Sequence, residues 1–411
     1  MKCRHCGAEV RLPMLDLGAS PPSNAYLTKL TLRRPEKCFP LRVFICENCW
    51  LVQAEAYSRA AELFNEEYAY FSSFSSEWVR HADNLVASAV EKYRLDGNSH
   101  VIEIASNDGY LLQHVAKRGI PCLGIEPTAS TAAVARQKGL EVVQEFLSMD
   151  LAHQLEQQGR RADYMVAINV LAHVPEINDF VKACAHLLKP HGVFTCEFPH
   201  LYRLVTEKQF DTVYHEHFSY LSFLTTVEIF AKAGLTVFDV EEIGTHGGSL
   251  RVSACRSDST EHSVNPRVEQ LMGREREAGM FSRAFYNGLQ TAAETIKDEL
   301  LLFLVNAKKS GEKVLGYGAA AKGNTLLNFA GVKPDLLPMV ADKSTFKQGR
   351  YLPGSRIPIV APADLVRAKP TKVIVFPWNL RDEVAKELRT LGLRNCDLVT
   401  AIPHIETYSR L

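Results

Sequence analysis

The sequence predicts an α/β protein built from three parts, and three observations support this prediction. Two C-x-x-C pairs, Cys3 with Cys6 and Cys46 with Cys49, lie at the ends of a short N-terminal segment. From residue 100 onward, short apolar strand-like runs alternate with turns and helical patterns. A second strand, glycine turn and helix start begin at Glu312. Such alternation is typical of an open, mostly parallel sheet with helices on both faces.

The composition is ordinary for a folded protein and argues against several classes of partner. The 411 residues suffice for about two to four domains of usual size. Lysine plus arginine and aspartate plus glutamate both number 47, so charge gives no reason to expect nucleic acid or a membrane surface as partner. No apolar run is long enough to cross a bilayer, and the N-terminus lacks the apolar core of a secretory signal. We therefore expect a cytoplasmic protein whose cysteines stay reduced. Separately, we expect a monomer.

The cysteine pairs predict a structural zinc site. Thiolates bind Zn²⁺ tetrahedrally, and a two-residue spacing allows both sulfurs of a pair to face one ion. Filling all positions with Cys3, Cys6, Cys46 and Cys49 leaves none open for chemistry. The long separation of the pairs keeps two alternatives open, namely unrelated cysteine pairs or a redox pair. Cys38 is expected to be a buried cysteine that binds no metal.

The first α/β unit places a candidate ligand site at the ends of its opening strands. Residues 100–105 are predicted to form a strand, 106–109 a turn, 110–118 a helix, and 121–125 a second strand closed by Glu126. An acid about 20 residues after such a turn accepts the ribose hydroxyls of a nucleoside at the carboxyl ends of the strands. The turn lacks the G-x-G-x-x-G pattern, and its acids suit a cationic ligand better than a pyrophosphate. We therefore expect S-adenosylmethionine rather than NAD, with another nucleotide as the alternative. The candidate residues are Glu103, Ala105, Asn107, Asp108, Gly109 and Glu126.

The flanking elements follow from periodicity and turn residues. Residues 68–76 are predicted to form an aromatic, hydroxyl-rich loop, and Ser75 or Ser76 to cap an amphipathic helix near residues 78–92. Residues 162–170 are predicted to form a fourth strand, with Asn169 and His173 at its end. His173 would stand where the donor's methyl group points, with a packing role as the alternative. Residues 192–198 are predicted to form another strand, and strands at 238–241 and 249–253, around the turn 246–248, would complete the antiparallel edge of the sheet.

The stretch from Tyr214 to Tyr220 concentrates polar side chains between the two α/β units. It contains His215, Glu216 and His217 next to two phenols. Such a cluster can transfer protons, bind a metal through its two histidines, or form a polar turn without chemistry. The residues alone leave these three possibilities open.

The C-terminal part begins after a mainly helical connection at residues 256–310. Gly316, Gly318 and Ala321 follow a strand in the G-x-G-x-x-[GA] form, and Asp342 ends the next strand. By itself this pattern indicates dinucleotide binding, whereas backbone amides at a helix start favour any phosphate or diphosphate. Cationic, aromatic and polar residues accumulate nearby: Lys322, Lys343, Lys347, Arg350, Trp378 and Asn379.

Taken in order, these segments resemble the S-adenosylmethionine-dependent C-methyltransferases that act on nucleoside-diphosphate 4-keto-deoxysugars and make branched-chain sugars. The resemblance covers nearly the whole chain. It is carried by the two cysteine pairs, Tyr70 to Ser73, Glu103 to Gly109, Asn169 to His173, Tyr214 to His217, His246 to Arg251, Gly318 to Asn324, Lys347 to Gly354, and Pro377 to Asn379.

The resemblance implies a domain organisation. It implies a zinc-binding module at residues 1–75, a Rossmann-like class I methyltransferase domain at 76–255, connecting helices at 256–310 and a C-terminal Rossmann-like domain at 311–411. The last domain would serve the sugar nucleotide rather than NAD. Ala105 is a departure, because many methyltransferases have glycine there, although its small side chain should still admit the donor. The implied substrate-binding residues are Gly318, Lys322, Asn324, Lys347, Arg350, Tyr351, Trp378 and Asn379.

The resemblance also implies a reaction. Removing the proton on carbon 3, beside the ketone at carbon 4, would give an enolate that attacks the sulfonium methyl group, with His217 as the base. Glu216 is implied as a second participant, while Tyr214, Tyr70 and His173 would line the sugar and Asn169 the donor. The implied cofactors are S-adenosylmethionine and structural Zn²⁺, and the small-molecule substrate would carry thymidine or guanosine.

Other functions remain compatible with parts of the sequence. An NAD-dependent sugar-nucleotide oxidoreductase or epimerase would use residues 313–342. A different methyltransferase would modify an oxygen or nitrogen of another small molecule. A zinc-ribbon module that binds nucleic acid would need a basic stripe, which the balanced charge does not provide.

Overall fold

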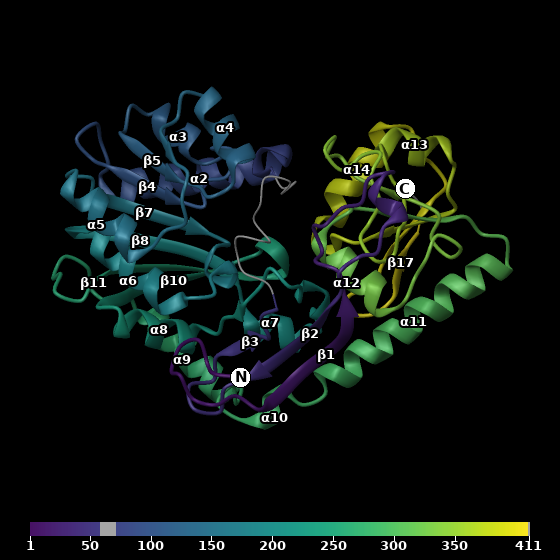
Figure 1. The fold of residues 1–411 in the computed structure, drawn as a ribbon, viewed down its shortest axis with the longest axis horizontal. Coiled ribbons are helices and arrows are strands. Elements are labelled where there is room, and N and C mark those ends of the chain that lie inside the picture. Colours follow the sequence, from purple (N-terminus) through teal and green to yellow (C-terminus); the bar gives the residue numbers. More distant parts are fainter. Residues whose placement is uncertain (58–70, 410–411) are drawn as a thin grey trace.

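The structure, a computed structural model, describes residues 1–57 and 71–409, and in these residues the strands form three sheets. Figure 1 shows the two larger sheets on opposite sides of the molecule, with the N-terminal strands below and between them. The predicted α/β fold class, with a cysteine-containing N-terminal module and Rossmann-like sheets, is confirmed.

The N-terminal sheet is antiparallel and has the strand order β1-β2-β3-β9. Its last strand comes from the polar stretch between the two α/β units, since Val52 pairs with Tyr220 and Gln53 with Ser219. The strands are β1 (Leu12–Ser20), β2 (Phe39–Ile45), β3 (Val52–Ala54) and β9 (Ser219–Tyr220).

The central sheet has seven strands in the order β10-β11-β8-β7-β4-β5-β6. Strands β4 to β8 run parallel, while β11 and β10 form the predicted antiparallel edge. Chain order reverses on the two sides of β4, which creates the crevice where ligands bind in sheets of this kind. The strands are β4 (Val101–Ile104), β5 (Cys122–Ile125), β6 (Val142–Val143), β7 (Ala162–Ile168), β8 (Leu188–Pro199), β10 (Leu235–Ile243) and β11 (Ser249–Arg256).

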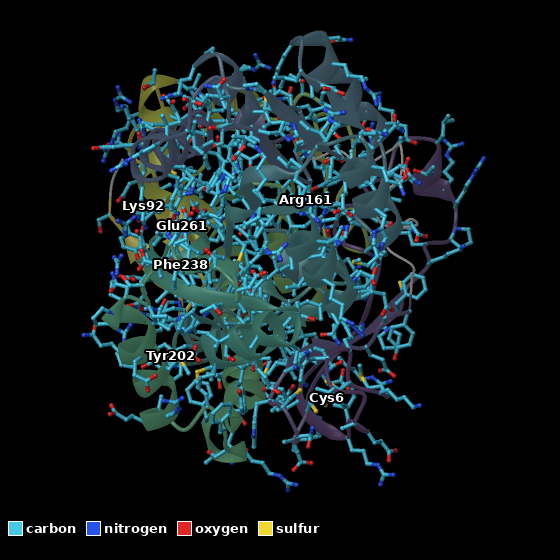
Figure 2. The ribbon with its side chains drawn as sticks, turned by 90° about the vertical axis from the view of Figure 1, so that its left-hand side faces the viewer. Cys6, Lys92, Arg161, Tyr202, Phe238 and Glu261 are labelled. Carbon is cyan, nitrogen blue, oxygen red and sulfur yellow. The ribbon has the colours of Figure 1, made fainter. Side chains whose placement is uncertain are left out.

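Helix α2 shows why the helices begin and end where they do. The Ser75 hydroxyl accepts a hydrogen bond from the Trp78 amide at 3.2 Å, which confirms one of the two predicted caps, and Arg94 ends the helix at φ 53°. Lys92 fastens α2 to β10 through Asp239 at 2.8 Å, beside the ring of Phe238 (Figure 2). The helices of this unit are α2 (Ser76–Tyr93), α3 (Leu112–Ala116), α4 (Ala129–Gln137), α5 (Met149–Gln157), α6 (Ile177–Leu187), α7 (Leu201–Thr206) and α8 (Phe223–Lys232).

The connecting segment is helical, as predicted. Figure 1 shows α11 running along the C-terminal unit, and its buried face of Ile296, Leu300 and Leu304 shares one hydrophobic core with strands β1 and β2 and with that unit. A common core makes the N-terminal sheet and the C-terminal unit pack as neighbours. The helices are α9 (Pro266–Glu277), α10 (Arg283–Tyr286) and α11 (Leu289–Lys309).

The C-terminal sheet has six strands in the order β14-β13-β12-β15-β16-β17, parallel except at β17. Its chain order reverses at β12, so this sheet also has a ligand-type crevice at its strand ends. The elements are β12 (Val314–Tyr317), α12 (Ala321–Phe329), β13 (Val340–Ala341), β14 (Ile359–Val360), α13 (Pro362–Arg367), β15 (Lys372–Val375), α14 (Arg381–Thr390), β16 (Asp397–Thr400) and β17 (Glu406–Tyr408).

Two expectations are corrected. Cys38 is exposed, not buried, because it lies in the segment just before β2, outside the core of the small N-terminal sheet. The helix expected over residues 110–118 is limited to Leu112–Ala116, since the turn after β4 extends further than the pattern indicated. Among the described residues, no helix is long and apolar enough to span a membrane.

Candidate active site

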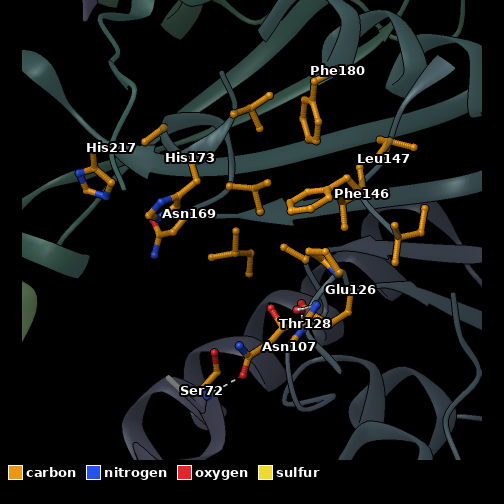
Figure 3. Close-up of a pocket in the computed structure, with 18 of the residues that line it drawn as sticks. Ser72, Asn107, Glu126, Thr128, Phe146, Leu147, Asn169, His173, Phe180 and His217 are labelled. Carbon is orange, nitrogen blue, oxygen red and sulfur yellow. Dashed lines mark hydrogen bonds between the residues drawn. The ribbon is translucent and has the colours of Figure 1, made fainter. Parts of the chain in front are cut away.

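A cavity of about 520 Å³ lies where the central sheet faces the C-terminal unit. Its wall includes the residues after β4 and β7 and the beginning of α12. Both sheets therefore meet the cavity at the crevice that their strand order creates. Figure 3 shows the donor-type residues Asn107 and Glu126 on one side and the imidazoles of His173 and His217 on the other.

The turn after β4 forms the polar end of the cavity. Both oxygens of Glu126 accept backbone hydrogen bonds, from the Asn107 amide at 2.9 Å and from the Thr128 amide at 2.9 Å. Burial raises the pKa of Glu126, and its oxygens retain lone pairs for ribose hydroxyls. Ala105 and Asn169 adopt the left-handed backbone conformation, at φ 53° and 55°. Glycine adopts this conformation most easily, so Ala105, where many methyltransferases have glycine, is accommodated in a strained backbone conformation.

An apolar wall adjoins this polar end. Phe146, Leu147 and Phe180 line the cavity beside Glu126 (Figure 3). An apolar surface of this kind suits an adenine ring, and the Glu126 carboxylate suits the ribose hydroxyls as a hydrogen-bond acceptor. The donor set thus fits S-adenosylmethionine better than a pyrophosphate, because the Asn107 amide is already bonded to a carboxylate.

Three candidate donor residues lie behind the cavity wall. Glu103 is buried in β4, and burial raises its pKa well above the usual range. Asp108 accepts a hydrogen bond from Ser73 and lies 3.7 Å from the Lys138 ammonium. Gly109 has φ +75°, and a Cβ there would come within 2.3 Å of Leu140. These residues shape the turn and are not among those that line the cavity.

The opposite end of the cavity carries a pair of oriented imidazoles. Nδ1 of His217 donates to the Thr212 carbonyl at 3.0 Å, and Nδ1 of His173 donates to the Glu216 carbonyl at 2.8 Å. A carbonyl oxygen only accepts, so Nδ1 carries the proton in both rings. Nε2 of His217 then presents a lone pair, and it has no hydrogen-bond partner among the residues that the structure describes. The Tyr214 ring lies 3.9 Å from the His217 ring.

Burial keeps these imidazoles neutral. It lowers the pKa of His217 well below its usual range, and the adjacent His173 acts in the same direction. Burial also lowers the pKa of His173 and of His246 to about 4. A neutral imidazole is the form that can accept a proton near neutral pH.

The buried histidines predict an acid-sensitive fold. The unfolded chain gains a proton at His173 below about pH 6.5, whereas the folded protein does so only near pH 4, so stability falls as pH falls through this interval. We expect His173→Asn to reduce the loss of unfolding free energy between pH 7 and pH 5 by about 2 kcal/mol. Urea unfolding at both pH values measures it, and an unchanged loss would contradict the neutral state of His173.

The other members of the polar stretch point elsewhere. Glu216 is buried off the cavity wall and accepts a hydrogen bond from Asn24, which does line the cavity, at 3.2 Å. His215 turns towards β2 and contacts the Phe39 carbonyl at 3.2 Å. His215 does not line the cavity, and among the described residues neither His215 nor His217 belongs to a group of three or more potential metal ligands. Tyr70 lies outside the described residues.

The C-terminal unit contributes Lys322 and Lys347 to the same cavity. The Lys322 ammonium donates to Asn379 at 2.9 Å and lies 4.4 Å above the ring of Trp378. Trp378 in turn donates to Asp211 at 2.9 Å. Trp378 and Asn379 therefore support the lysine and do not line the cavity.

The remaining candidates of this unit have structural contacts. Gly318 has φ +93°, and a Cβ there would lie 2.3 Å from Pro377, so only glycine fits the turn. The Asn324 amide donates to the Ser23 carbonyl at 2.6 Å, and Tyr351 pairs with Leu27. The backbone amide of Arg350 donates to the Lys347 carbonyl at 3.1 Å.

The glycine turn is occupied by a carboxylate of the chain itself. Asp342 accepts a hydrogen bond from the Ala319 amide at 2.8 Å and from the Ser344 amide at 2.8 Å. In a dinucleotide site this acid would contact a ribose and the amides would contact the pyrophosphate. Its inward orientation argues against NAD binding here.

Several residues that line the cavity were not predicted as site residues from the sequence. His246 has φ 56° and lies 5.1 Å, ring to ring, from Trp78, which also lines the cavity. Gly247 and Gly248 were interpreted only as a turn. Consecutive glycines also indicate a place where other groups pack directly against the backbone, and Trp378 packs in this way against Gly247. Asn24 and Phe146 had no local signal, because they enter the site only through tertiary contacts.

The cysteines meet as predicted. Sγ of Cys3 lies 3.5 Å from that of Cys49, Sγ of Cys6 lies 3.5 Å from that of Cys46, and all four sulfurs are within 4.8 Å of one another. Zinc–sulfur bonds of about 2.3 Å place tetrahedral sulfurs about 3.8 Å apart, so this cluster fits Zn²⁺. Figure 2 shows Cys6 at the N-terminal ribbon.

Family models match three consecutive parts of the chain. Residues 3–64 match a model described as "Putative zinc binding domain", residues 78–240 a "Methyltransferase domain" and residues 244–403 a "C-methyltransferase C-terminal domain". With the fold and the donor-type cavity, these matches define the chain as an S-adenosylmethionine-dependent methyltransferase.

Comparison with known proteins narrows the class. The chain is 30% identical to the C-methyltransferase NovU of Streptomyces niveus over 93% of this chain and 91% of that protein. It therefore belongs to the C-methyltransferase family. A ubiquinone biosynthesis O-methyltransferase of Xylella fastidiosa is 28% identical over 34% of this chain and 61% of its own length. A solved magnesium protoporphyrin IX methyltransferase of Synechocystis with bound S-adenosylmethionine is 19% identical, with a TM-score of 0.34 over 44% of this chain and 79% of that chain.

Proposed function

We propose that this C-methyltransferase methylates carbon 3 of a nucleoside-diphosphate 4-keto-6-deoxysugar, in the biosynthesis of a branched deoxysugar. The observation that carries the proposal is the orientation of His217. Its Nδ1 proton is held by the Thr212 carbonyl, so the lone pair of Nε2 is available inside a cavity that also holds a donor-type turn and two lysines.

The proposed base acts on a carbon made acidic by its neighbour. A ketone at carbon 4 stabilises the carbanion at carbon 3 as an enolate, so the base that removes the proton does not need to be strong. Nε2 of His217 takes that proton and becomes an imidazolium, whose Nδ1 proton remains on the Thr212 carbonyl. Tyr214 and Tyr70 are the candidates to donate a hydrogen bond to the enolate oxygen, because the one ring proton of neutral His173 is already donated to the Glu216 carbonyl. S-adenosylmethionine, when bound, supplies the electrophilic methyl group on its sulfonium.

Glu216 is proposed to act from behind this site. It is buried, and its contact with Asn24 orients an amide that reaches the cavity. The backbone carbonyl of Glu216 also holds His173. This residue thus connects two side chains of the cavity wall.

The two lysines are proposed to hold the diphosphate. Lys322 and Lys347 come from the unit that lies opposite the donor turn, so a sugar nucleotide anchored there would place its sugar towards His217. Lys322 is kept in position by Asn379 and Trp378. Burial lowers the pKa of this lysine, and an added anion would favour its charged form.

Replacing Lys322 by methionine tests this assignment, because the change removes the charge and keeps the length of the side chain. We expect the KM for the sugar nucleotide to rise about 10- to 100-fold, the usual effect of losing a hydrogen bond to a charged group. Lys343→Met is the matched control, since Lys343 pairs with Glu387 at 2.8 Å and does not line the cavity. Equal effects of both changes would contradict a specific role.

The function itself is tested with a panel of substrates. The protein is incubated with S-adenosylmethionine and thymidine- or guanosine-diphosphate 4-keto-6-deoxysugars, and each product is analysed by mass and by nuclear magnetic resonance. A gain of one methyl group on carbon 3 supports the proposal. Methylation of an oxygen, or of another carbon, contradicts it.

A further inference from the structure

Three phenylalanines form a contact between the donor turn and the C-terminal unit, and we call them the aromatic clasp: Phe71, Phe74 and Phe346. The rings of Phe71 and Phe346 are stacked at 4.6 Å with 17° between their planes. Phe74 lies 6.0 Å from Phe346 and 5.8 Å from Phe71. Phe74 and Phe346 are each 45% exposed, so they lie at the surface rather than in a hydrophobic core.

One end of the clasp is bonded to the donor turn. The Ser72 amide, next to Phe71, donates to the Asn107 side chain at 2.9 Å (Figure 3), and the Ser73 hydroxyl donates to Asp108. The backbone amide of Asn107 in turn donates to Glu126. The clasp therefore reaches the residues that fit the ribose of the methyl donor through two hydrogen bonds.

The other end belongs to the loop after β13. Phe346 immediately precedes Lys347, whose ammonium donates to the Ala319 carbonyl at 2.9 Å and lies 3.5 Å from Asp342. Lys347 lines the cavity, whereas Phe346 does not. A shift of this loop thus changes the stacking on Phe71 and the position of a cavity cation together.

We propose that Phe346 is a positioning residue for the methyl donor, and that the aromatic clasp couples donor binding to anion binding at Lys347. Phe346 holds Phe71, and Phe71 holds Ser72 and Ser73 on the donor turn. Ordering this segment lowers the entropy that donor binding must remove, so the donor binds more tightly when the stack is formed. Because binding free energies are linked, an anion that orders the Lys347 loop tightens donor binding, and the donor tightens anion binding equally.

The donor arm of the test does not depend on the proposed sugar substrate. The Kd of S-adenosylhomocysteine is measured by calorimetry for the full chain and for Phe346→Ala. We expect binding to weaken about 3- to 10-fold, the range of a lost aromatic pair. Phe346→Tyr keeps the stack and should restore wild-type affinity. The matched control is Phe281→Ala, because Phe281 is 43% exposed and its ring contacts Trp50 and no residue of the clasp. Unchanged affinity in Phe346→Ala, or an equal loss in Phe281→Ala, would overturn the proposal.

The second arm rests on the proposed function and measures the coupling itself. The Kd of S-adenosylhomocysteine is compared with and without thymidine diphosphate. We expect the anion to tighten binding in the wild type and in Phe346→Tyr, and to lose that effect in Phe346→Ala. Full coupling in Phe346→Ala would refute transmission through the clasp. If thymidine diphosphate does not bind the wild type, the diphosphate assignment fails, and the result of the first arm still decides the positioning role.

Discussion

Replacing His217 by asparagine is expected to lower turnover about a hundred- to ten-thousand-fold, the usual contribution of a positioned base. Asparagine can still donate to the Thr212 carbonyl, but it offers no basic nitrogen to the cavity. S-adenosylhomocysteine should bind with nearly unchanged affinity, because the donor turn is built from other elements. Turnover is measured by methyl transfer, and proton removal by deuterium exchange at carbon 3 without a methyl donor.

His215→Gln is the matched control for this experiment. His215 belongs to the same stretch but faces the Phe39 carbonyl outside the cavity, so its replacement should leave exchange and turnover within about threefold of wild type, as expected for a site remote from the reacting atoms. Exchange that persists in His217→Asn would identify a different base. Loss of donor binding in the same variant would show that His217 acts on the fold.

Replacing Cys46 by serine is expected to release zinc and to abolish most of the turnover. The Cys46 thiolate follows β2 directly. Strand β3, just beyond Cys49, pairs with β9 at the end of the polar stretch Tyr214–Tyr220. The Ala54 amide also donates to the Phe218 carbonyl, next to His217, at 3.0 Å. A small module that loses its metal loses much of its folding free energy, and here the loss would release one side of the stretch that carries the proposed base.

Metal analysis and donor binding separate this effect from general unfolding. The wild type should contain about one zinc ion per chain, as expected for a site with four cysteines, and Cys46→Ser should contain much less. Its central sheet forms without β9, so S-adenosylhomocysteine should still bind. Cys38→Ser is the control, since Cys38 is exposed and outside the cluster. Retention of zinc and turnover in Cys46→Ser would contradict a structural role for the metal.

Local patterns in the sequence were sufficient to predict the fold class and to place Glu126 beside the turn that follows β4. Apolar residues recur with the period of a strand or a helix, so each element can be recognised locally. Alternation of the two elements then predicts parallel sheets. The turn 106–109 and Glu126 were predicted to lie together because the carboxyl ends of neighbouring parallel strands share one edge of the sheet, and the Asn107 amide does donate to Glu126. The cysteine pairs were found because metal geometry restricts spacing inside each pair.

Contacts between distant segments decided which side chains face the cavity. His215 and His217 are two residues apart and alike in sequence, yet only His217 faces the cavity, because the Thr212 and Phe39 carbonyls orient the two rings differently. The approach of Lys322 to the imidazoles, and that of Phe346 to Phe71, also depends on how whole units pack. The sequence by itself determined which elements form and which residue types reach the strand ends, since those depend on local periodicity. Only the tertiary structure decided which nitrogen carries a proton and which charges share one cavity, since these depend on the sum of many contacts between residues far apart in the chain.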